Sequence, residues 1–211
     1  MKPYILAAYN IVKFNLIKLF RCSGLSLEGV LLTGFNTRLS VKRSSVIVLG
    51  KRVISDGRLT IIADDNALIE IGSCVYFNEG CMISSKSKVQ IGEGCQFGPN
   101  VKIFDNDHCY SAVAGVLSMH TSAPIAIGKN CWIAANVTIL KGATIGDNCV
   151  IGAGTVVKGE IPDGSIVTQE RNFIFVLLKQ EKDDEKENLD FNAFDVYRWS
   201  GEKSIGLVGL F

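Results

Sequence analysis

An aliphatic residue recurs every six positions in the second half of this chain. The series is Ile127, Ile133, Ile139, Ile145, Ile151 and Val157. Glycine follows directly at positions 128, 146 and 152, and a small or medium-sized residue such as Cys131 stands four places after the aliphatic one. An α-helix would repeat its apolar positions about every 3.6 residues, and a simple strand every two. A period of six therefore indicates a repeat architecture.

This repeat predicts a parallel β-helix. Each six-residue unit makes one short flat side, three sides close a triangular coil of about 18 residues, and the coils stack about 4.8 Å apart. The large aliphatic side chain points inward, the small residue fits beneath a corner, and we expect glycine to supply the backbone angles of the turns. Cys131 and Cys149 then act as small inward-facing hydrophobes rather than redox groups.

The same rhythm continues upstream in a less regular form. Two further runs are Ile71, Phe77, Ile83 and Ile91, Phe97, Ile103. Val53 and Leu59 keep the spacing, whereas Asp65 breaks it. We expect about five coils between residues 45 and 162, with atypical repeats at the ends. The chain then divides into an N-terminal segment 1–44, a β-helix domain 45–165 and a C-terminal extension 166–211.

The rhythm stops after Ile103 and resumes in phase at Ile127, because the interval between them is a whole number of hexapeptides. The segment of about 104–124 is therefore predicted to be a loop that leaves the β-helix and returns to it. Loops on rigid scaffolds often carry function. This one holds both histidines of the chain, His108 and His120, of which we interpret His120 as a surface residue.

Charge and cysteine usage exclude several classes of protein. With 22 basic and 21 acidic residues the net charge is +1, so no broad field attracts nucleic acid. The seven cysteines are an odd number and form no Cys-x-x-Cys pair, and only two histidines are present. Neither a disulfide scaffold nor a metal site fits this pattern. We expect buried free thiols, no metal and a cytoplasmic location.

The N-terminus is apolar and basic. Residues 3–20 are mostly apolar, but two lysines interrupt them, so they are marginal as a membrane span and poor as a signal peptide. Apolar side chains recur at helical spacing at Ile5, Tyr9, Val12, Leu16 and Leu19. A helix packed on the core or on a neighbouring subunit is favoured. Peripheral contact of residues 1–21 with the inner membrane face stays open.

Residues 127–162, IGKNCWIAANVTILKGATIGDNCVIGAGTVVKGEIP, resemble the hexapeptide-repeat acyltransferases, in particular the galactoside and maltose O-acetyltransferase branch and polysaccharide O-acetyltransferases. The resemblance covers about residues 70–165. It implies an all-β fold, a left-handed parallel β-helix with a short N-terminal helix and a C-terminal extension. It also implies acetyl-CoA as co-substrate, and a homotrimer with active sites between subunits.

That branch carries an asparagine, a catalytic histidine and a tryptophan in this order. Asn78, His108 and Trp132 match them at the corresponding positions relative to the repeats. Histidine suits a general base near neutral pH, which would take the proton of a sugar hydroxyl and pass it to the CoA thiolate. Asp105, Asp107 or a loop carbonyl would orient its ring. Asn78 would stabilise acceptor or oxyanion, and Trp132 would offer a flat surface beside CoA or the sugar.

The resemblance also implies a CoA site along the edge of the later coils. Ala135, Ala153 and Lys158 match that region, and Arg171 is a candidate for a further basic contact. Lys86 stands where the galactoside enzymes carry an acidic acceptor-binding residue. The acceptor is therefore expected to differ from a simple galactoside. A lipid-linked or surface-polysaccharide sugar at the inner membrane face would suit the apolar N-terminus.

The expected activity is O-acetylation of a carbohydrate in surface polysaccharide or lipopolysaccharide biosynthesis. N-acetylation of an amino-sugar nucleotide and a non-catalytic β-helix module remain as alternatives. A γ-class carbonic anhydrase shares the scaffold but needs three histidines on zinc, whereas this chain has two. A covalent route through Cys109 is disfavoured, because adjacent residues seldom point the same way.

Overall fold

The computed structural model describes residues 3–21, 24–169, 174–176 and 196–198 of the 211-residue chain. The chain divides into two units, residues 1–169 and 170–211. In the second unit, β23 (Ile174–Val176) pairs antiparallel with β24 (Val196–Arg198). The first unit contains the β-helix.

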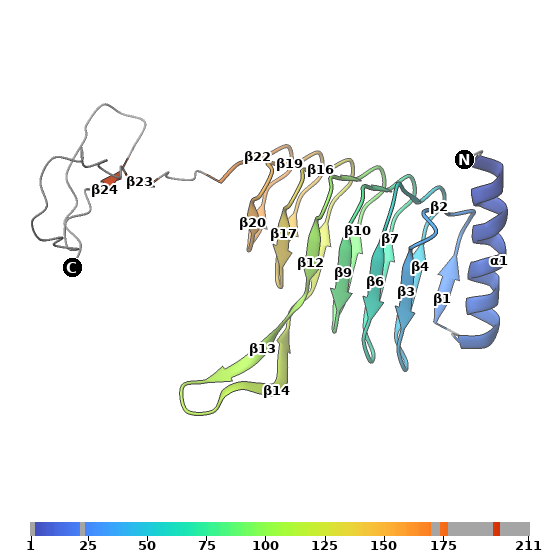
Figure 1. The fold of residues 1–211 in the computed structure, drawn as a ribbon, viewed down its shortest axis with the longest axis horizontal. Helices are drawn as coiled ribbons and strands as arrows, with labels where there is room; N and C mark the ends of the chain where they lie inside the picture. Colours follow the sequence, from blue (N-terminus) through green and yellow to red (C-terminus); the bar gives the residue numbers. More distant parts are fainter. Residues whose placement is uncertain (1–2, 22–23, 170–173, 177–195, 199–211) are drawn as a thin grey trace, which may run out of the picture. The chain divides into compact units, whose positions relative to one another are not determined.

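Three parallel sheets wind together in this unit (Figure 1). Sheet A contains β1 (Leu25–Leu27), β4 (Val46–Leu49), β7 (Leu68–Ile71), β10 (Lys88–Ile91), β15 (Ile125–Ile127), β18 (Thr144–Ile145) and β21 (Glu160–Ile161). Sheet B contains β2 (Leu32–Thr33), β5 (Ile54–Ser55), β8 (Tyr76–Phe77), β11 (Gln96–Phe97), β16 (Trp132–Ile133), β19 (Val150–Ile151) and β22 (Ile166–Val167). Sheet C contains β3 (Arg38–Val41), β6 (Thr60–Ala63), β9 (Met82–Ser85), β12 (Lys102–Phe104), β17 (Thr138–Leu140) and β20 (Val156–Val157). The chain visits A, B and C in turn, which makes six full coils and part of a seventh.

The six-residue series forms the core, as predicted. Its members, from Ile127 to Val157, are each at most 3% exposed. The five coils expected between residues 45 and 162 are present. The predicted domain boundaries at 45 and 165 do not match the coils, however, because strand pairing begins at Leu25 and still includes Ile166 and Val167.

The irregular upstream rhythm has a geometric cause. Leu25 pairs with Ile47 and Ile47 pairs with Ile69, so the first coils are longer than three hexapeptides. Ala126 pairs with Thr144, and this later coil is three hexapeptides long. The early strands of sheet C are four residues long, whereas β20 has two. Because longer sides add residues, the buried apolar positions no longer recur every six residues. Asp65 therefore falls at an exposed corner.

Glycine has two roles at the corners. Some corner glycines supply the left-handed turn angle, as predicted: Gly80, Gly94, Gly142 and Gly154 have a positive φ. The non-glycine residues in the left-handed region include Asn130, Asn136 and Asn148, and asparagine tolerates this conformation. Gly128 and Gly146 do not have a positive φ. A Cβ on Gly128 would lie 2.6 Å from the carbonyl carbon of Gly146 in the next coil. These glycines allow the close approach of stacked corners.

The N-terminal helix covers the open end of the β-helix beside β1 and β2 (Figure 1). It is α1 (Pro3–Arg21), and its side chains Asn10 and Phe14 are each 1% exposed. The Asn10 amide nitrogen donates to the carbonyls of Leu31 at 3.2 Å and Thr33 at 2.9 Å. Because these carbonyls belong to the first coil, which has no coil before it to pair with, the helix satisfies its exposed backbone.

The apolar stripe expected from helical spacing does not make this contact. Ile5, Val12, Leu16 and Leu19 are 48–76% exposed, and only Tyr9, at 38%, reaches the first coil, where its ring packs edge-on against Phe35. The helix therefore packs on the core, as favoured from the sequence, but mainly through other residues. No helix in the described residues is long and apolar enough to span a membrane.

Candidate active site

The segment expected to leave the β-helix is an ordered hairpin. Its strands β13 (Asn106–Ser111) and β14 (Gly115–Ser122) pair antiparallel and project from the coil after β12 (Figure 1). His108 and His120 lie opposite each other in this ribbon, with ring centroids 4.2 Å apart and planes tilted by 47°. His120, interpreted from the sequence as a plain surface residue, is thus the immediate neighbour of the candidate base.

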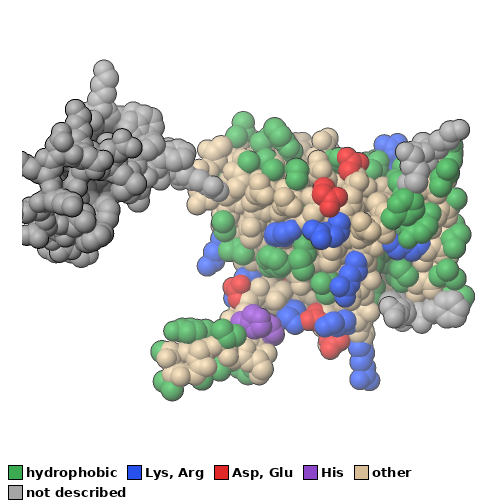
Figure 2. Space-filling view, in the orientation of Figure 1, with side chains coloured by type: hydrophobic (Ala, Val, Ile, Leu, Met, Phe, Trp, Pro, Cys, Tyr) green, Lys and Arg blue, Asp and Glu red, His purple; other side chains and the backbone are tan. Residues whose placement is uncertain are grey.

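The imidazoles lie among charged groups. Figure 2 shows the histidine side chains at the base of the hairpin, beside lysine or arginine and acidic side chains. Desolvation, followed by the positive charges of Lys86 and His108, lowers the pKa of His120. A lowered pKa keeps His120 neutral near pH 7, where it can accept or donate a hydrogen bond.

Asp105 does not orient His108. Its side chain is fully buried and accepts hydrogen bonds from the Ser85 hydroxyl at 2.6 Å and from the backbone N–H groups of Lys86 and Ser87 at 2.8 Å. It therefore caps the corner of the preceding coil, beneath the point where the hairpin departs. The predicted catalytic role of Asp105 is wrong in this geometry.

The alternative aspartate is also engaged elsewhere. The Asp107 carboxylate pairs with the Lys141 ammonium at 3.1 Å, and the same ammonium bonds to the Thr121 hydroxyl. Among the described residues neither carboxylate is thus a hydrogen-bond partner of His108.

Lys86 lies under the hairpin in a small ion-pair cluster. Its ammonium contacts the Asp64 carboxylate, which also pairs with Lys42. The two hydrogen bonds from these lysines lower the pKa of Asp64 from its ordinary 3.8 to about 2. Within this cluster two ammonium groups face one carboxylate.

Asn78 and Trp132 lie on sheet B. Asn78 follows β8, and its Oδ1 accepts the backbone N–H of Glu79 at 2.7 Å, which makes the amide nitrogen the available donor. Trp132, in β16, pairs with Gln96 and is 56% exposed. The coil that carries β11 separates the two. The hairpin that carries His108 leaves the coil after its strand in sheet C. Within one chain, His108 therefore lies on a different side of the prism from Asn78 and Trp132.

The candidate CoA contacts occupy the last coils. Ala135 and Ala153 lie at the corner between sheets B and C, where the Gly154 N–H donates to the Ala135 carbonyl at 2.8 Å. Lys158 follows β20 and is exposed. Lys158 therefore lies at the corner between sheets C and A, one side of the prism away from Ala135 and Ala153. Arg171 is outside the described residues.

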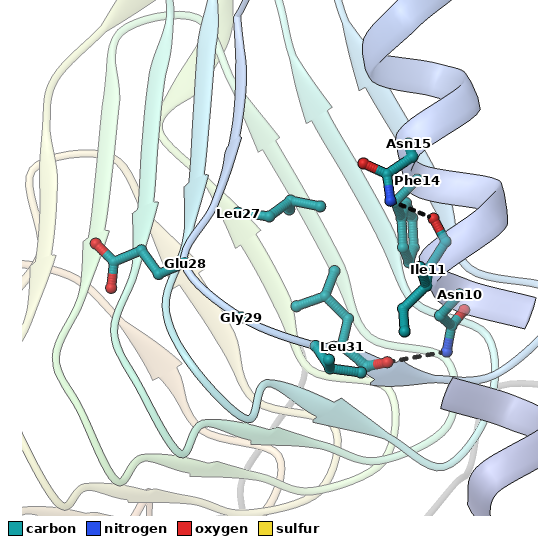
Figure 3. A pocket seen from close by; sticks show the side chains of 9 residues that line it. Asn10, Ile11, Phe14, Asn15, Leu27, Glu28, Gly29 and Leu31 are labelled. Carbon is teal, nitrogen blue, oxygen red and sulfur yellow. Dashed lines mark hydrogen bonds between the residues drawn. The ribbon is translucent and has the colours of Figure 1, made fainter. Parts of the chain in front are cut away.

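Pockets of the single chain lie elsewhere. One of about 270 Å³ lies between α1 and the first coil, with Asn10, Phe14 and Leu31 in its lining (Figure 3). A second, of about 480 Å³, is lined in part by Asp56, Arg58 and Glu79. Neither contains a predicted site residue. No group of three or more potential metal ligands exists within the described part of the chain.

Two residues near the candidate base were missed by sequence reasoning. His120 and Lys141 come together with His108 only through the pairing register of the hairpin and the coil beneath it. The presence of two histidines in one interrupting segment was the available signal for His120. For Lys141 the sequence carries no signal, since it occupies an ordinary corner of the repeat.

Comparison with known proteins supports the resemblance. Residues 124–159 match the family model described as bacterial transferase hexapeptide (six repeats). The chain is 39% identical over 94 residues to galactoside O-acetyltransferase of Escherichia coli (strain K12), covering 44% of this chain and 46% of the relative. It is 40% identical over 99 residues to nodulation protein L of Rhizobium meliloti (strain 1021), covering 47% and 54%. The chain thus spans about half the length of these curated relatives.

The fold also matches a solved structure. AntD, an N-acyltransferase from Bacillus cereus in complex with dTDP and 3-hydroxybutyryl-CoA, superposes with a TM-score of 0.59 at 17% identity, covering 73% of this chain and 81% of that one. At this identity the likeness concerns the fold alone. The left-handed β-helix of hexapeptide repeats that the sequence predicts is confirmed.

Proposed function

We propose that this protein transfers an acetyl group from acetyl-CoA to a sugar hydroxyl, with His108 as general base. The observation that carries the proposal is the exposed imidazole of His108, which an ordered hairpin holds out from a chain that shares 39% identity over 94 residues with a galactoside O-acetyltransferase. An exposed imidazole on a rigid scaffold is accessible to an acceptor hydroxyl, which supports the role of general base.

The residues divide the chemistry as follows. Acetyl-CoA supplies a thioester carbonyl when bound. His108 accepts the proton of the attacking hydroxyl and later gives it to the departing thiolate sulfur, so the imidazole ends neutral. Asn78 is the proposed donor to the oxygen on which negative charge develops, because its own Oδ1 is held by Glu79 and its nitrogen is the group left to donate. Asp105 supports the hairpin instead of entering the reaction.

The proposed cofactor surface is the edge of the last coils. Trp132 offers an exposed flat ring there, Ala135 and Ala153 expose backbone at a corner without bulky side chains, and Lys158 supplies a positive charge for a phosphate. Arg171 stays a prediction for a further phosphate contact.

The acceptor is proposed to be a sugar of a surface polysaccharide or lipopolysaccharide, rather than a simple galactoside. Lys86 supports this, since it replaces an acidic residue and lies in a cluster with a second ammonium group beneath the hairpin. N-acetylation of an amino-sugar nucleotide remains the rival, and the structural likeness to an N-acyltransferase shows only that the fold supports both.

We further propose a homotrimer with active sites between subunits. Asn78 and Trp132 lie on sheet B whereas His108 leaves after sheet C, so a neighbouring chain would complete the site. Exposed apolar residues on the hairpin, including Val113 at 99% and Val116 at 68%, would then be covered by the neighbour.

The test is release of free CoA from acetyl-CoA with a panel of hydroxyl and amine sugars, measured by chromatography. Wild type should turn over a hydroxyl acceptor, and His108→Ala should lower the rate on the order of 10²–10⁴-fold while CoA still binds. Unchanged turnover in His108→Ala would remove the assigned base. Transfer only to amines would favour the rival, and absence of CoA binding would favour a non-catalytic module.

A further inference from the structure

Lys141 joins the hairpin to the coil above it. The residue follows β17, and its side chain is 27% exposed. Its ammonium reaches the Asp107 carboxylate at 3.1 Å and also bonds to the Thr121 hydroxyl. Asp107 and Thr121 face each other across the ribbon, one on each strand. A single ammonium therefore ties both strands of the hairpin to the β-helix.

The tie lies directly beside the histidine pair. In the pairing register, Asp107 and Thr121 are followed by His108 and His120. The register then shifts between His108 and Tyr110, so the regular ladder is interrupted just beyond the imidazoles. The Lys141 contact is thus the last side-chain anchor to the coils before this irregularity, among the described residues.

Below the hairpin the anchor is of another kind. Asp105, buried in the preceding coil, holds the point of departure through Ser85 and the backbone of Lys86 and Ser87. The Asp105 side chain also accepts from the Asn106 amide at the start of β13, and the Asp105 carbonyl accepts the N–H of Ala123, which follows β14. Above the hairpin, Lys141 alone acts on both strands in the part of the chain that the structure describes.

We propose that Lys141 is a positioning residue, which sets the direction of the His108 imidazole by clamping Asp107 and Thr121 at the base of the hairpin. The proposal deepens the function proposed above and depends on it for its catalytic consequence. A partly exposed ion pair contributes little to global stability. A misplacement of a reacting group by about 1 Å, in contrast, can cost up to about 10²-fold in rate.

The first experiment reads the imidazoles directly and needs no substrate. Because the chain has two histidines, a long-range ¹H–¹⁵N spectrum contains two ring systems. Lys141→Met should shift and broaden both sets of signals, and Lys141→Arg should retain them, since guanidinium can donate to both oxygens. Lys129→Met is the matched control, which removes an exposed lysine from another corner.

The second experiment measures acetyl transfer by the same variants. Lys141→Met should lower kcat about ten-fold, leave the KM for acetyl-CoA within about two-fold and leave the thermal midpoint close to wild type. Lys141→Arg should recover most of kcat, and Lys129→Met should match wild type. Asp107→Asn combined with Lys141→Met should be no worse than Lys141→Met alone, because both remove one clamp.

Imidazole signals of Lys141→Met identical to those of wild type would overturn the proposal, as would an unchanged kcat in an active enzyme. A fall in thermal midpoint that accounts for the loss of rate would also overturn it. If wild type transfers no acetyl group at all, the proposed function fails, while the spectra still decide whether Lys141 holds the histidine pair.

Discussion

At the scale of single residues, a sequence motif locates a side chain along the coils but does not identify its hydrogen-bond partner. The spacing of Asn78, His108 and Trp132 against the repeat predicts where each lies along the coils, and their roles stay predictions. The partner of the histidine was misassigned, because Asp105 is near in sequence but points into the preceding corner. Its neighbour His120 depends on hairpin register, which no single-residue pattern encodes.

Asp64 yields a prediction about pH. Its folded pKa, about 2, lies below the ordinary 3.8, because the lysine ammonium groups stabilise the carboxylate. The stabilisation is therefore fully present above about pH 4 and is lost as the pH falls towards 2. Asp64→Asn should lower the free energy of unfolding at pH 6 and differ progressively less from wild type below pH 4, as measured by urea titrations.

The matched control for this experiment is Asp65→Asn, which changes an exposed carboxylate at the same corner. It should leave the pH profile close to that of wild type. A constant offset between Asp64→Asn and wild type from pH 6 to pH 2 would refute the electrostatic explanation.

At the scale of elements, the regular coils could be predicted and the irregular ones could not. Six-residue spacing located the coils of three hexapeptides, because one aliphatic side chain falls on each side. The longer early coils escape the pattern, since their longer sides add residues whose burial alternates every two positions. The first coil therefore falls in the segment 1–44 that the sequence predicts to precede the β-helix, and helical spacing in α1 does not identify Asn10 and Phe14 as its packing residues.

Corner glycines give a prediction at this scale. Gly128→Ala should destabilise the fold by about 1–3 kcal/mol, because the new Cβ would lie 2.6 Å from backbone that cannot move freely. Gly152→Ala is the control at the same repeat position. Its Cβ would approach the Thr168 methyl at 3.1 Å and the Val167 carbonyl oxygen at 3.2 Å, and both contacts are looser than the one at Gly128. Chemical unfolding of both variants measures the difference, and equal losses would contradict the close-approach explanation.

At the scale of the whole molecule, Asn78 and His108 lie on different sides of one prism, and this can be tested by mixing two inactive variants. His108→Ala and Asn78→Ala should each be nearly inactive alone. If sites form between subunits, trimers refolded from an equal mixture should recover about a quarter of wild-type activity, because one site in four then combines an intact histidine with an intact asparagine. No recovery would place both residues of a site in one chain, or exclude a shared site.

The outer face of α1 leads to a separate prediction for the molecule as a whole. The helix contains Lys18 and Arg21 but no acidic residue, and large apolar side chains are exposed on it, so we propose peripheral binding to anionic membranes. The double substitution Val12→Ser and Leu16→Ser should weaken sedimentation with phosphatidylglycerol vesicles by about ten-fold or more. Val113→Ser, on the hairpin, is the control. Equal binding by all three proteins would contradict membrane contact through α1.

The hairpin that carries His108 leaves the winding and re-enters it in step: Val89 still pairs with Ile125 across the interruption. A stacked prism accepts added sequence as longer sides, as in the first coils, or as a loop that leaves and re-enters at one corner. The hairpin that carries His108 can therefore be lengthened, shortened or replaced without changes in the sequence of the coils on either side of it. In such a molecule, substitutions or insertions in one hairpin can change the substrate specificity while the coils that support it stay the same.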